Sequence, residues 1–378
     1  MKIESSALNE AMKKVMIITK RKAMMPILNK VRIEARDGKL ICTCTDLQTW
    51  LELGLNCDGD LGAICVDPAS LVTSGTGLVD ISVDVGKVMI KTSASVSGAI
   101  LFEASEFPLG NFDSGVLAGS GVIDMTGLNL AIAEIKSAVS TDATREHLCG
   151  INLSKDGEVV ATDGHRLAKS QIAIPADIFA DVSYMPEGAK KPIVYSCDTT
   201  LPTDSLRVLK SLAGSGTVER RCVGVDNTRL IFTVGADRVC IRTIAGEFPN
   251  YQRIIGQEVT GEVSFEVKPL RKFLDQIKTR FVKGGAEGVE ITCNGHLQAK
   301  WYDLESGELQ ADFDLIKSGP VFVGSFNYRY LIDAMGKNKV VTLAVMCTPC
   351  QAVTPTKLTS PIKIIGVNSE CVVMPMRL

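Results

Sequence analysis

The densest group of side chains that could do chemistry lies in residues 161–168, which read Ala-Thr-Asp-Gly-His-Arg-Leu-Ala. Asp163 and His165 have the residue types of a general acid and base pair. The chain has three histidines, and it has no nucleophile elbow, phosphate-binding loop or HExxH motif. Because catalysis demands much more geometry than one Asp and one His on a turn, we interpret the pair as hydrogen-bonding partners within a tight turn. We expect no enzymatic activity.

Cysteines could bind a metal, and the chain has 12 of them. Cys347 and Cys350 form a CxxC pair, but no second CxxC or nearby histidine completes the four ligands of a zinc site. Most of the others lie in alternating apolar runs, which predicts small core side chains. Examples of these are Cys42, Cys44, Cys240 and Cys371. The sequence therefore predicts neither a metal nor a cofactor.

The last seven residues are unusually apolar for a chain terminus, with Val372, Val373, Met374, Met376 and Leu378. The two valines fit a final strand that completes a sheet. The methionines beyond them are typical of an adaptable peptide-binding groove. On the residues alone, a peptide groove and a plain core contact are equally good interpretations, since both bury apolar area.

The composition is that of a globular protein: 378 residues, 46% hydrophobic and 22% charged. This excludes disorder, collagen and coiled coil as the main architecture. There is no apolar run of 18 residues and no signal peptide at the N-terminus, so we expect a cytoplasmic protein without a membrane span. The net charge of -2 argues against nucleic-acid binding over the whole surface, but it permits binding by segregated charge.

Repeats predict how these side chains are positioned. Three stretches have apolar residues at helical spacing, 5–19, 126–139 and 268–281. Each is followed by a hairpin signal, at Asp37-Gly38, Asp156-Gly157 and Asn294-Gly295. Each unit then continues with strands and a second helix, expected near 67–75, 203–213 and 326–336. The chain is therefore predicted to be α+β, with three similar domains at 1–120, 121–253 and 254–378, each with two helices and antiparallel sheets.

Basic residues gather on two of the first helices. Residues 13–22 contain five Lys or Arg and no acid, and residues 268–283 contain six against one Asp. In the middle unit, Arg207 and Lys210 lie on the second helix. A charge cluster is usually a solvated face. Its recurrence on equivalent repeat elements indicates a polyanion that is not read by sequence.

The motifs resemble those of a known family, the bacterial DNA polymerase III β subunit, or sliding clamp. Three motifs carry the resemblance, at 161–168, at 247–254 (Glu-Phe-Pro-Asn-Tyr-Gln-Arg-Ile) and at 373–378 (Val-Met-Pro-Met-Arg-Leu). Residues 25–28, 45–47 and 326–331 are also similar to the family. The resemblance covers the whole chain in the correct order.

This resemblance implies a DNA clamp fold and a ring made of two chains. Duplex DNA would thread the ring without sequence-dependent contacts, and the basic helices would face it. The ring would tether the replicative polymerase and the clamp loader through peptides of the type Gln-Leu-x-Leu-Phe. These would bind in a cleft between domains two and three.

The resemblance also implies which residues take part. The cleft positions are Thr162, Gly164, His165, Arg166, Leu167, Pro249, Ile254, Asn327, Tyr330, Val372, Met374, Pro375, Met376, Arg377 and Leu378. The residues expected to face DNA are Lys13, Lys20, Arg21, Lys22, Arg145, His147, Arg207, Lys210, Arg271, Lys278 and Arg280. At 145–147 this chain has Arg-Glu-His where the family has Arg followed by two aromatic residues.

Two alternatives belong to other classes of protein. One is a metal- or His-dependent hydrolase that uses Asp163, His165 and the Cys347/Cys350 pair. The other is a peptide-binding scaffold with no DNA role. Replacement of His165 by Ala separates the first from a clamp, and charge reversal on the basic helices separates the second.

Overall fold

The computed structural model describes residues 1–19, 25–110, 112–179, 182–184, 193–195, 199–223, 228–281, 284–346 and 356–376. The chain divides into two compact units. Unit 1 comprises 1–129, 154–157 and 173–246, and unit 2 comprises 130–153, 158–172 and 247–378. The three-domain division with boundaries at 120 and 253 stays a prediction.

Unit 1 is built on antiparallel sheets. The larger has the order β5 (Leu61–Val66), β2 (Val31–Arg36), β3 (Lys39–Thr45), β4 (Thr49–Asn56), β18 (Asp237–Arg242), β17 (Thr228–Val234), β16 (Ser215–Cys222) and β9 (Val116–Asp124). The smaller has the order β1 (Lys2–Glu4), β6 (Leu78–Asp84), β7 (Lys87–Lys91) and β8 (Val96–Ile100). Strands β13 (Val182–Tyr184) and β14 (Ile193–Tyr195) form a hairpin, and β15 is Thr199–Pro202.

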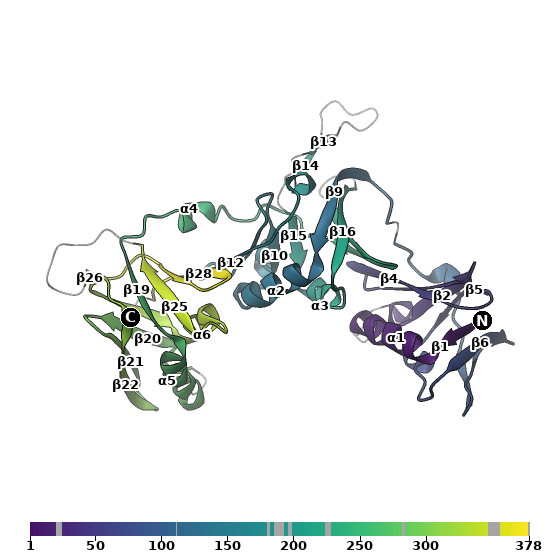
Figure 1. Ribbon diagram of the computed structural model, residues 1–378, viewed down its shortest axis with the longest axis horizontal. Coiled ribbons are helices and arrows are strands. Elements are labelled where there is room, and N and C mark those ends of the chain that lie inside the picture. The colour runs from purple at the N-terminus through teal and green to yellow at the C-terminus, as the bar shows by residue number, and fades with distance from the viewer. Residues whose placement is uncertain are drawn as a thin grey trace. The chain divides into compact units, whose positions relative to one another are not determined.

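In unit 2 the sheet that carries the candidate site joins distant parts of the chain. Its order is β10 (Gly150–Leu153), β11 (Glu158–Thr162), β12 (Arg166–Gln171), β28 (Ser369–Val373), β27 (Ile362–Ile365), β25 (Val340–Val345), β19 (Gly261–Glu266) and β23 (Leu315–Lys317). Figure 1 shows the last strand, β28, beside β12. The second sheet has the order β22 (Gly307–Phe313), β21 (Leu297–Asp303), β20 (Gly288–Cys293), β24 (Phe322–Asn327) and β26 (Thr356–Lys357).

The first helix of each repeat is confirmed. Helix α1 is Ser5–Thr19, α5 is Val267–Arg280, and α2 is Met125–Ile135, which continues as a 3-10 turn over Lys136–Ala138. In α1 the predicted apolar face is buried, with Leu8 and Val15 fully inaccessible. Such a stripe is stable because it packs on a sheet rather than facing water.

The second helices are shorter than predicted. Residues 67–75 form only a 3-10 turn, Pro68–Leu71, and the β-branched Val72 and Thr73 follow in non-helical backbone. Residues 203–213 form a 3-10 turn, Thr203–Ser205, and α3, Leu206–Leu209, and Gly214 with φ +85° follows. Near 326–336 the structure has α6, Tyr328–Met335. The remaining helical pieces are α4, Gln252–Ile255, and 3-10 turns at Pro26–Asn29, Ala104–Glu106, Ala143–Leu148 and Ala176–Phe179.

The hairpin and cysteine predictions are confirmed. At the first turn Asp37 and Gly38 both have positive φ, as a two-residue type I′ turn requires, and they join β2 to β3. Asp156-Gly157 and Asn294-Gly295 lie between the paired strands β10–β11 and β20–β21. The four cysteines expected in the core are buried. No helix in the described part of the chain is long and apolar enough to cross a membrane.

Candidate functional site

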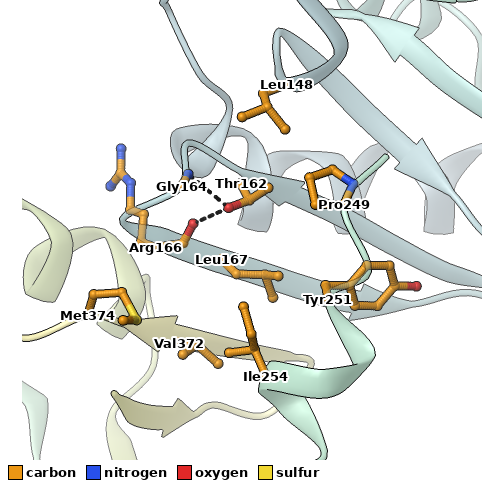
Figure 2. Close-up of a pocket in the computed structure, with 10 residues that line it drawn as sticks. All are labelled: Leu148, Thr162, Gly164, Arg166, Leu167, Pro249, Tyr251, Ile254, Val372 and Met374. Atoms are coloured by element: carbon orange, nitrogen blue, oxygen red, sulfur yellow. Dashed lines mark hydrogen bonds between the residues drawn. The ribbon is translucent and has the colours of Figure 1, made fainter. Parts of the chain in front are cut away.

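An apolar pocket opens on the sheet of unit 2 (Figure 2). Its lining comes from β11, β12, β28 and the segment 247–256, with one residue from the 3-10 turn before β10. The lining residues are Leu148, Thr162, Gly164, Arg166, Leu167, Pro249, Tyr251, Ile254, Val372 and Met374. Most of these side chains are aliphatic or aromatic, which suits the burial of apolar groups from a ligand.

Strand register explains why the lining residues share one face. Leu167 on β12 pairs with Thr162 on β11 on one side and with Val372 on β28 on the other. Directly paired residues point to the same face of a sheet, so these three side chains form a continuous floor. Beyond β28, the Met374 N–H donates to the His165 carbonyl at 3.0 Å, which holds the methionine beside the turn.

The turn between β11 and β12 is a closed hydrogen-bond network, as the sequence predicted. The Asp163 carboxylate accepts from the backbone N–H groups of His165 at 2.9 Å and Arg166 at 3.0 Å. The Thr162 hydroxyl accepts from the Gly164 N–H and donates to the Arg166 carbonyl at 2.6 Å. Because Asp163 serves as the acceptor of the turn, its role is structural rather than that of an acid or base.

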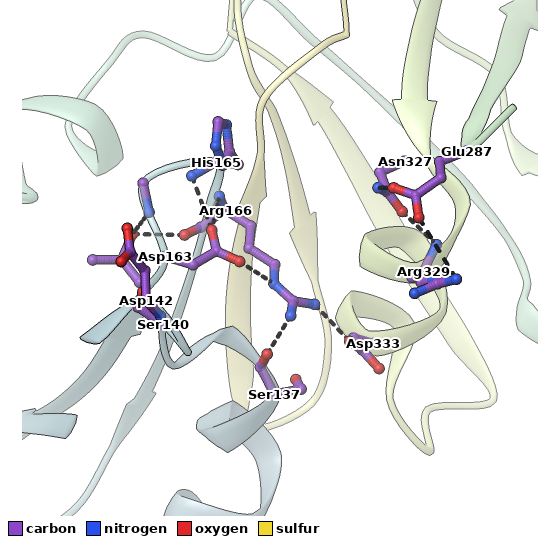
Figure 3. A network of polar contacts seen from close by, with 12 residues as sticks. Ser137, Ser140, Asp142, Asp163, His165, Arg166, Glu287, Asn327, Arg329 and Asp333 are labelled. Atoms are coloured by element: carbon purple, nitrogen blue, oxygen red, sulfur yellow. Dashed lines mark hydrogen bonds and ion pairs between the residues drawn. The ribbon is translucent and has the colours of Figure 1, made fainter. Parts of the chain in front are cut away.

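Arg166 links this turn to α6 (Figure 3). Its guanidinium donates to Asp163 Oδ2 at 3.0 Å, to Asp333 Oδ2 at 2.5 Å and to the Ser137 carbonyl. The same group lies over the Tyr330 ring, 4.2 Å from its centroid. The guanidinium of Arg166 is therefore occupied by contacts within unit 2, while the rest of the residue contributes to the pocket wall.

The segment 247–256 forms the opposite wall. Phe248, Tyr251 and Ile255 are buried in a cluster that also contains Leu167 and Val372. The Phe248 and Tyr251 rings meet edge to face, with centroids 6.1 Å apart. Ile254, next to the buried Ile255, is partly exposed and lines the pocket.

The structure brings most of the predicted cleft residues together. Eight line the pocket, namely Thr162, Gly164, Arg166, Leu167, Pro249, Ile254, Val372 and Met374. Tyr330 contacts Arg166, and Met376 is held by a bond from its N–H to the Ser325 carbonyl at 2.7 Å. Asn327 caps α6 and donates to Glu287. His165 and Pro375 are not among the lining residues, and Arg377 and Leu378 lie outside the described residues.

Two lining residues were not predicted, Leu148 and Tyr251. Tyr251 lies within the second quoted motif, which was the available signal. Leu148 carries no signal in the sequence beyond its apolar type. Arg145 also lies at this site. Its Nη1 atom is so close to the backbone of Gly164 that a Cβ atom at that position would lie only 2.8 Å from it.

The predicted DNA-facing residues differ in their exposure and in their contacts within the protein. Lys13, Arg207, Lys210, Lys278 and Arg280 are exposed. Arg145 is paired with Asp142 at 3.1 Å, and His147 beside it is half-buried. Arg271 donates to the carbonyls of Ile332 and Gly336 at the end of α6. Lys20, Arg21 and Lys22 lie outside the described residues.

Metal chemistry finds no support in the described ranges, where no three His, Cys, Asp or Glu side chains could hold an ion together. Cys347 and Cys350, on which the hydrolase alternative depends, lie outside those ranges. The pKa of the buried Cys42 thiol is raised to about 12 by its removal from water and by the nearby Asp237. That of Cys371 is likewise raised to about 12, mainly by burial. These thiols stay protonated and unreactive near neutral pH.

Curated proteins similar to this chain match it over nearly its whole length. No protein-family model matches it. The chain is 27% identical over 357 residues to the beta sliding clamp of Caulobacter vibrioides, with 89% of each protein covered. It is 26% identical to the beta sliding clamp of Synechocystis, with 90% of this chain and 93% of that protein covered.

Solved structures show the same fold. The DNA polymerase III subunit beta of Pseudomonas aeruginosa superimposes with a TM-score of 0.82 at 22% identity, with 100% of this chain and 99% of that chain covered. The DNA polymerase sliding clamp of Bacillus subtilis gives a TM-score of 0.80 at 20% identity, with 100% and 98% covered.

These findings define the chain as a protein of the DNA clamp fold. Within that fold, the full-length relatives confirm the resemblance seen in the motifs: the chain is similar over nearly its whole length to bacterial beta sliding clamps.

Proposed function

We propose that this protein is a β sliding clamp, a non-enzymatic processivity factor of DNA replication. The observation that carries the proposal is the agreement between full-length similarity to β sliding clamps and an apolar pocket built from the motif residues. In this role the clamp raises the local concentration of a polymerase at the primer end, so that dissociation is followed by rebinding.

The pocket would bind partner peptides of the type Gln-Leu-x-Leu-Phe. Its floor of Leu167 and Val372 and its walls of Ile254 and Met374 offer apolar surface to leucine and phenylalanine side chains. Such anchors carry most of the affinity of small interfaces. Two related structures support a ligand site on this fold: the Pseudomonas aeruginosa sliding clamp was solved bound to griselimycin, and the C. crescentus clamp with PEG at a putative beta-motif tethering region.

The proposal extends to DNA and to assembly. Two chains would form a ring of six similar domains, with boundaries at 120 and 253 in each chain, around duplex DNA. Exposed Lys13, Lys278 and Arg280 would face the phosphates. Topological linkage would hold the ring in place, so the phosphate contacts need only be weak and free of sequence preference. The replicative polymerase and the clamp loader would share the pocket.

The peptide claim is tested by fluorescence anisotropy of a labelled Gln-Leu-Ser-Leu-Phe peptide. The full chain should bind with a dissociation constant in the micromolar range (about -8 kcal/mol). A version that ends at Val373 lacks Met374 and should bind at least about tenfold more weakly, since it loses an apolar wall. A peptide with both leucines and the phenylalanine replaced by alanine is the matched control. If the folded full chain does not distinguish the two peptides, the pocket is not a partner site.

A further inference from the structure

Four charged side chains of alternating sign cross four neighbouring strands of the unit 2 sheet. We call them the charged ladder: Glu158 on β11, Lys169 on β12, Glu370 on β28 and Lys363 on β27. The Lys169 Nζ atom lies 2.9 Å from Glu158 Oε1 and 3.6 Å from Glu370 Oε2. The Lys363 Nζ atom lies 4.0 Å from the same Glu370 oxygen.

The charged ladder lies on the same face of the sheet as the pocket. Lys169 pairs directly with Glu370, just as Leu167 pairs with Val372 two residues away. Since side chains alternate along a strand, residues two apart point to one face. The pocket floor and the charged ladder therefore share one surface. Lys363 lies in the row of the pocket floor, since it pairs with Val372, and Lys169 and Glu370 form the next row.

The two ends of the charged ladder hold the two ends of α4. At one end, Glu158 Oε2 accepts from the Tyr251 hydroxyl and from Gln252 Nε2, both at 2.7 Å. At the other end, Lys363 Nζ donates to the Ile255 carbonyl at 3.1 Å. Figure 2 shows the Tyr251 ring at the pocket with its hydroxyl directed away from Leu167 and Val372.

Burial makes these bonds costly to break. Glu158 and Lys363 are only 9% and 8% exposed, and a buried charge that loses its partner is strongly destabilising. Partial burial raises the pKa of Glu158, but the bonds from Tyr251, Lys169 and Gln252 outweigh it, so that its pKa lies below the ordinary value and the carboxylate is charged near neutral pH. A short helix of four residues has little stability of its own, so its position depends on such anchors.

We infer that the charged ladder is the positioning device for α4, which it holds in place so that Tyr251 and Ile254 form a pocket wall before a ligand arrives. This inference rests on the proposed function, since it concerns affinity at the same pocket. A wall that is already ordered spares the ligand the entropic cost of ordering it. Glu158 is thus a positioning residue that acts through Tyr251 and Gln252.

The test combines exchange and binding measurements on the full chain. In Glu158→Gln, amide hydrogen exchange over residues 252–256 should be about tenfold faster, because weaker anchoring lets α4 open more often. The affinity for the Gln-Leu-Ser-Leu-Phe peptide should fall about threefold, since a smaller fraction of the protein has the wall in place. Glu262→Gln is the matched control. It removes a carboxylate that binds Lys317 at 2.8 Å on the same sheet, at β19, and it should change neither value.

A second variant covers the case in which Glu158→Gln does not fold. Tyr251→Phe removes the hydroxyl bond but keeps the ring, and it should reproduce the faster exchange. Where both variants fold, their combined effect should be smaller than the sum of the single effects, because both break one interaction. Unchanged exchange in either folded variant overturns the inference, and so does full affinity in Glu158→Gln. If the unaltered chain binds no peptide, the proposed partner site fails, and the exchange results alone decide the role of the charged ladder.

Discussion

Arg166 belongs to the motif that most suggested chemistry, and its surroundings explain why the motif is structural. Its side chain is 14% exposed, and it donates to Asp163, to Asp333 and to a backbone carbonyl. Two carboxylates and a carbonyl around one guanidinium satisfy the charge where water is largely excluded. The group that an enzyme would use to bind an anionic substrate is here occupied within the protein.

We predict that Arg166→Ala destabilises unit 2 by about 2 kcal/mol, because it leaves Asp163 and Asp333 without their shared cation. Urea unfolding followed by circular dichroism measures this change. Lys317→Ala, which removes an exposed partner of Glu262, is the control and should cost less than about 0.5 kcal/mol. Equal losses of unfolding free energy in the two variants would mean that the contacts of Arg166 stabilise unit 2 no more than a surface ion pair does.

The elements of the repeat differ in how strongly their own sequence defines them. Helices α1 and α5 have 15 and 14 residues and a continuous apolar stripe, so their spacing alone located them. Helix α6 has 8 residues, and both of its ends have side-chain caps, one local and one from another helix. Asn327 accepts from the Arg329 N–H at its start, and Arg271 of α5 donates to carbonyls at its end.

This capping contact separates two roles for Arg271, which the resemblance placed among the DNA-facing residues. We predict that Arg271→Ala lowers the stability of unit 2 by about 1 kcal/mol, since the last carbonyls of α6 lose a charged donor. The neighbouring Lys272 is exposed, and Lys272→Ala should change stability by less than about 0.5 kcal/mol. Urea unfolding of both variants gives the comparison. Identical midpoints would show that the capping contact adds nothing.

For the whole molecule, the central fact is a net charge of -2 in a protein proposed to surround DNA. Such a protein needs basic residues gathered on a limited surface and acids elsewhere. The exposed candidates that the structure describes include Lys13 of α1 and Lys278 and Arg280 of α5, besides Arg207 and Lys210 at α3.

We therefore predict that reversal of Lys13, Lys278 and Arg280 to Glu strongly reduces retention on primed circular DNA, measured by gel filtration after loading. Peptide affinity should stay unchanged, because none of the three lines the pocket. Reversal of the exposed Lys39, Lys155 and Lys300 alters the net charge equally and is the control. Light scattering should give a mass about twice 40.6 kDa for all variants. Equal retention of both triple variants would contradict the DNA role.

Local signals predicted much of this protein. The turn at Asp163, the hairpins at Asp37-Gly38 and Asn294-Gly295, and the helices α1 and α5 each depend on residues within a few positions of one another. The backbone conformation that a Gly or a capping Asp favours is a property of that short stretch. The resemblance to clamps rested on such contiguous motifs.

The pocket and the charged ladder depend instead on contacts between distant residues. Lys169 meets Glu370, and Leu167 meets Val372, because β12 pairs with β28 in one register out of several that alternating strands allow. A shift of one residue would move each side chain to the other face. Leu148, Tyr251 and Glu158 therefore reveal their roles in the folded sheet, where strand register and burial bring together residues that no local pattern connects.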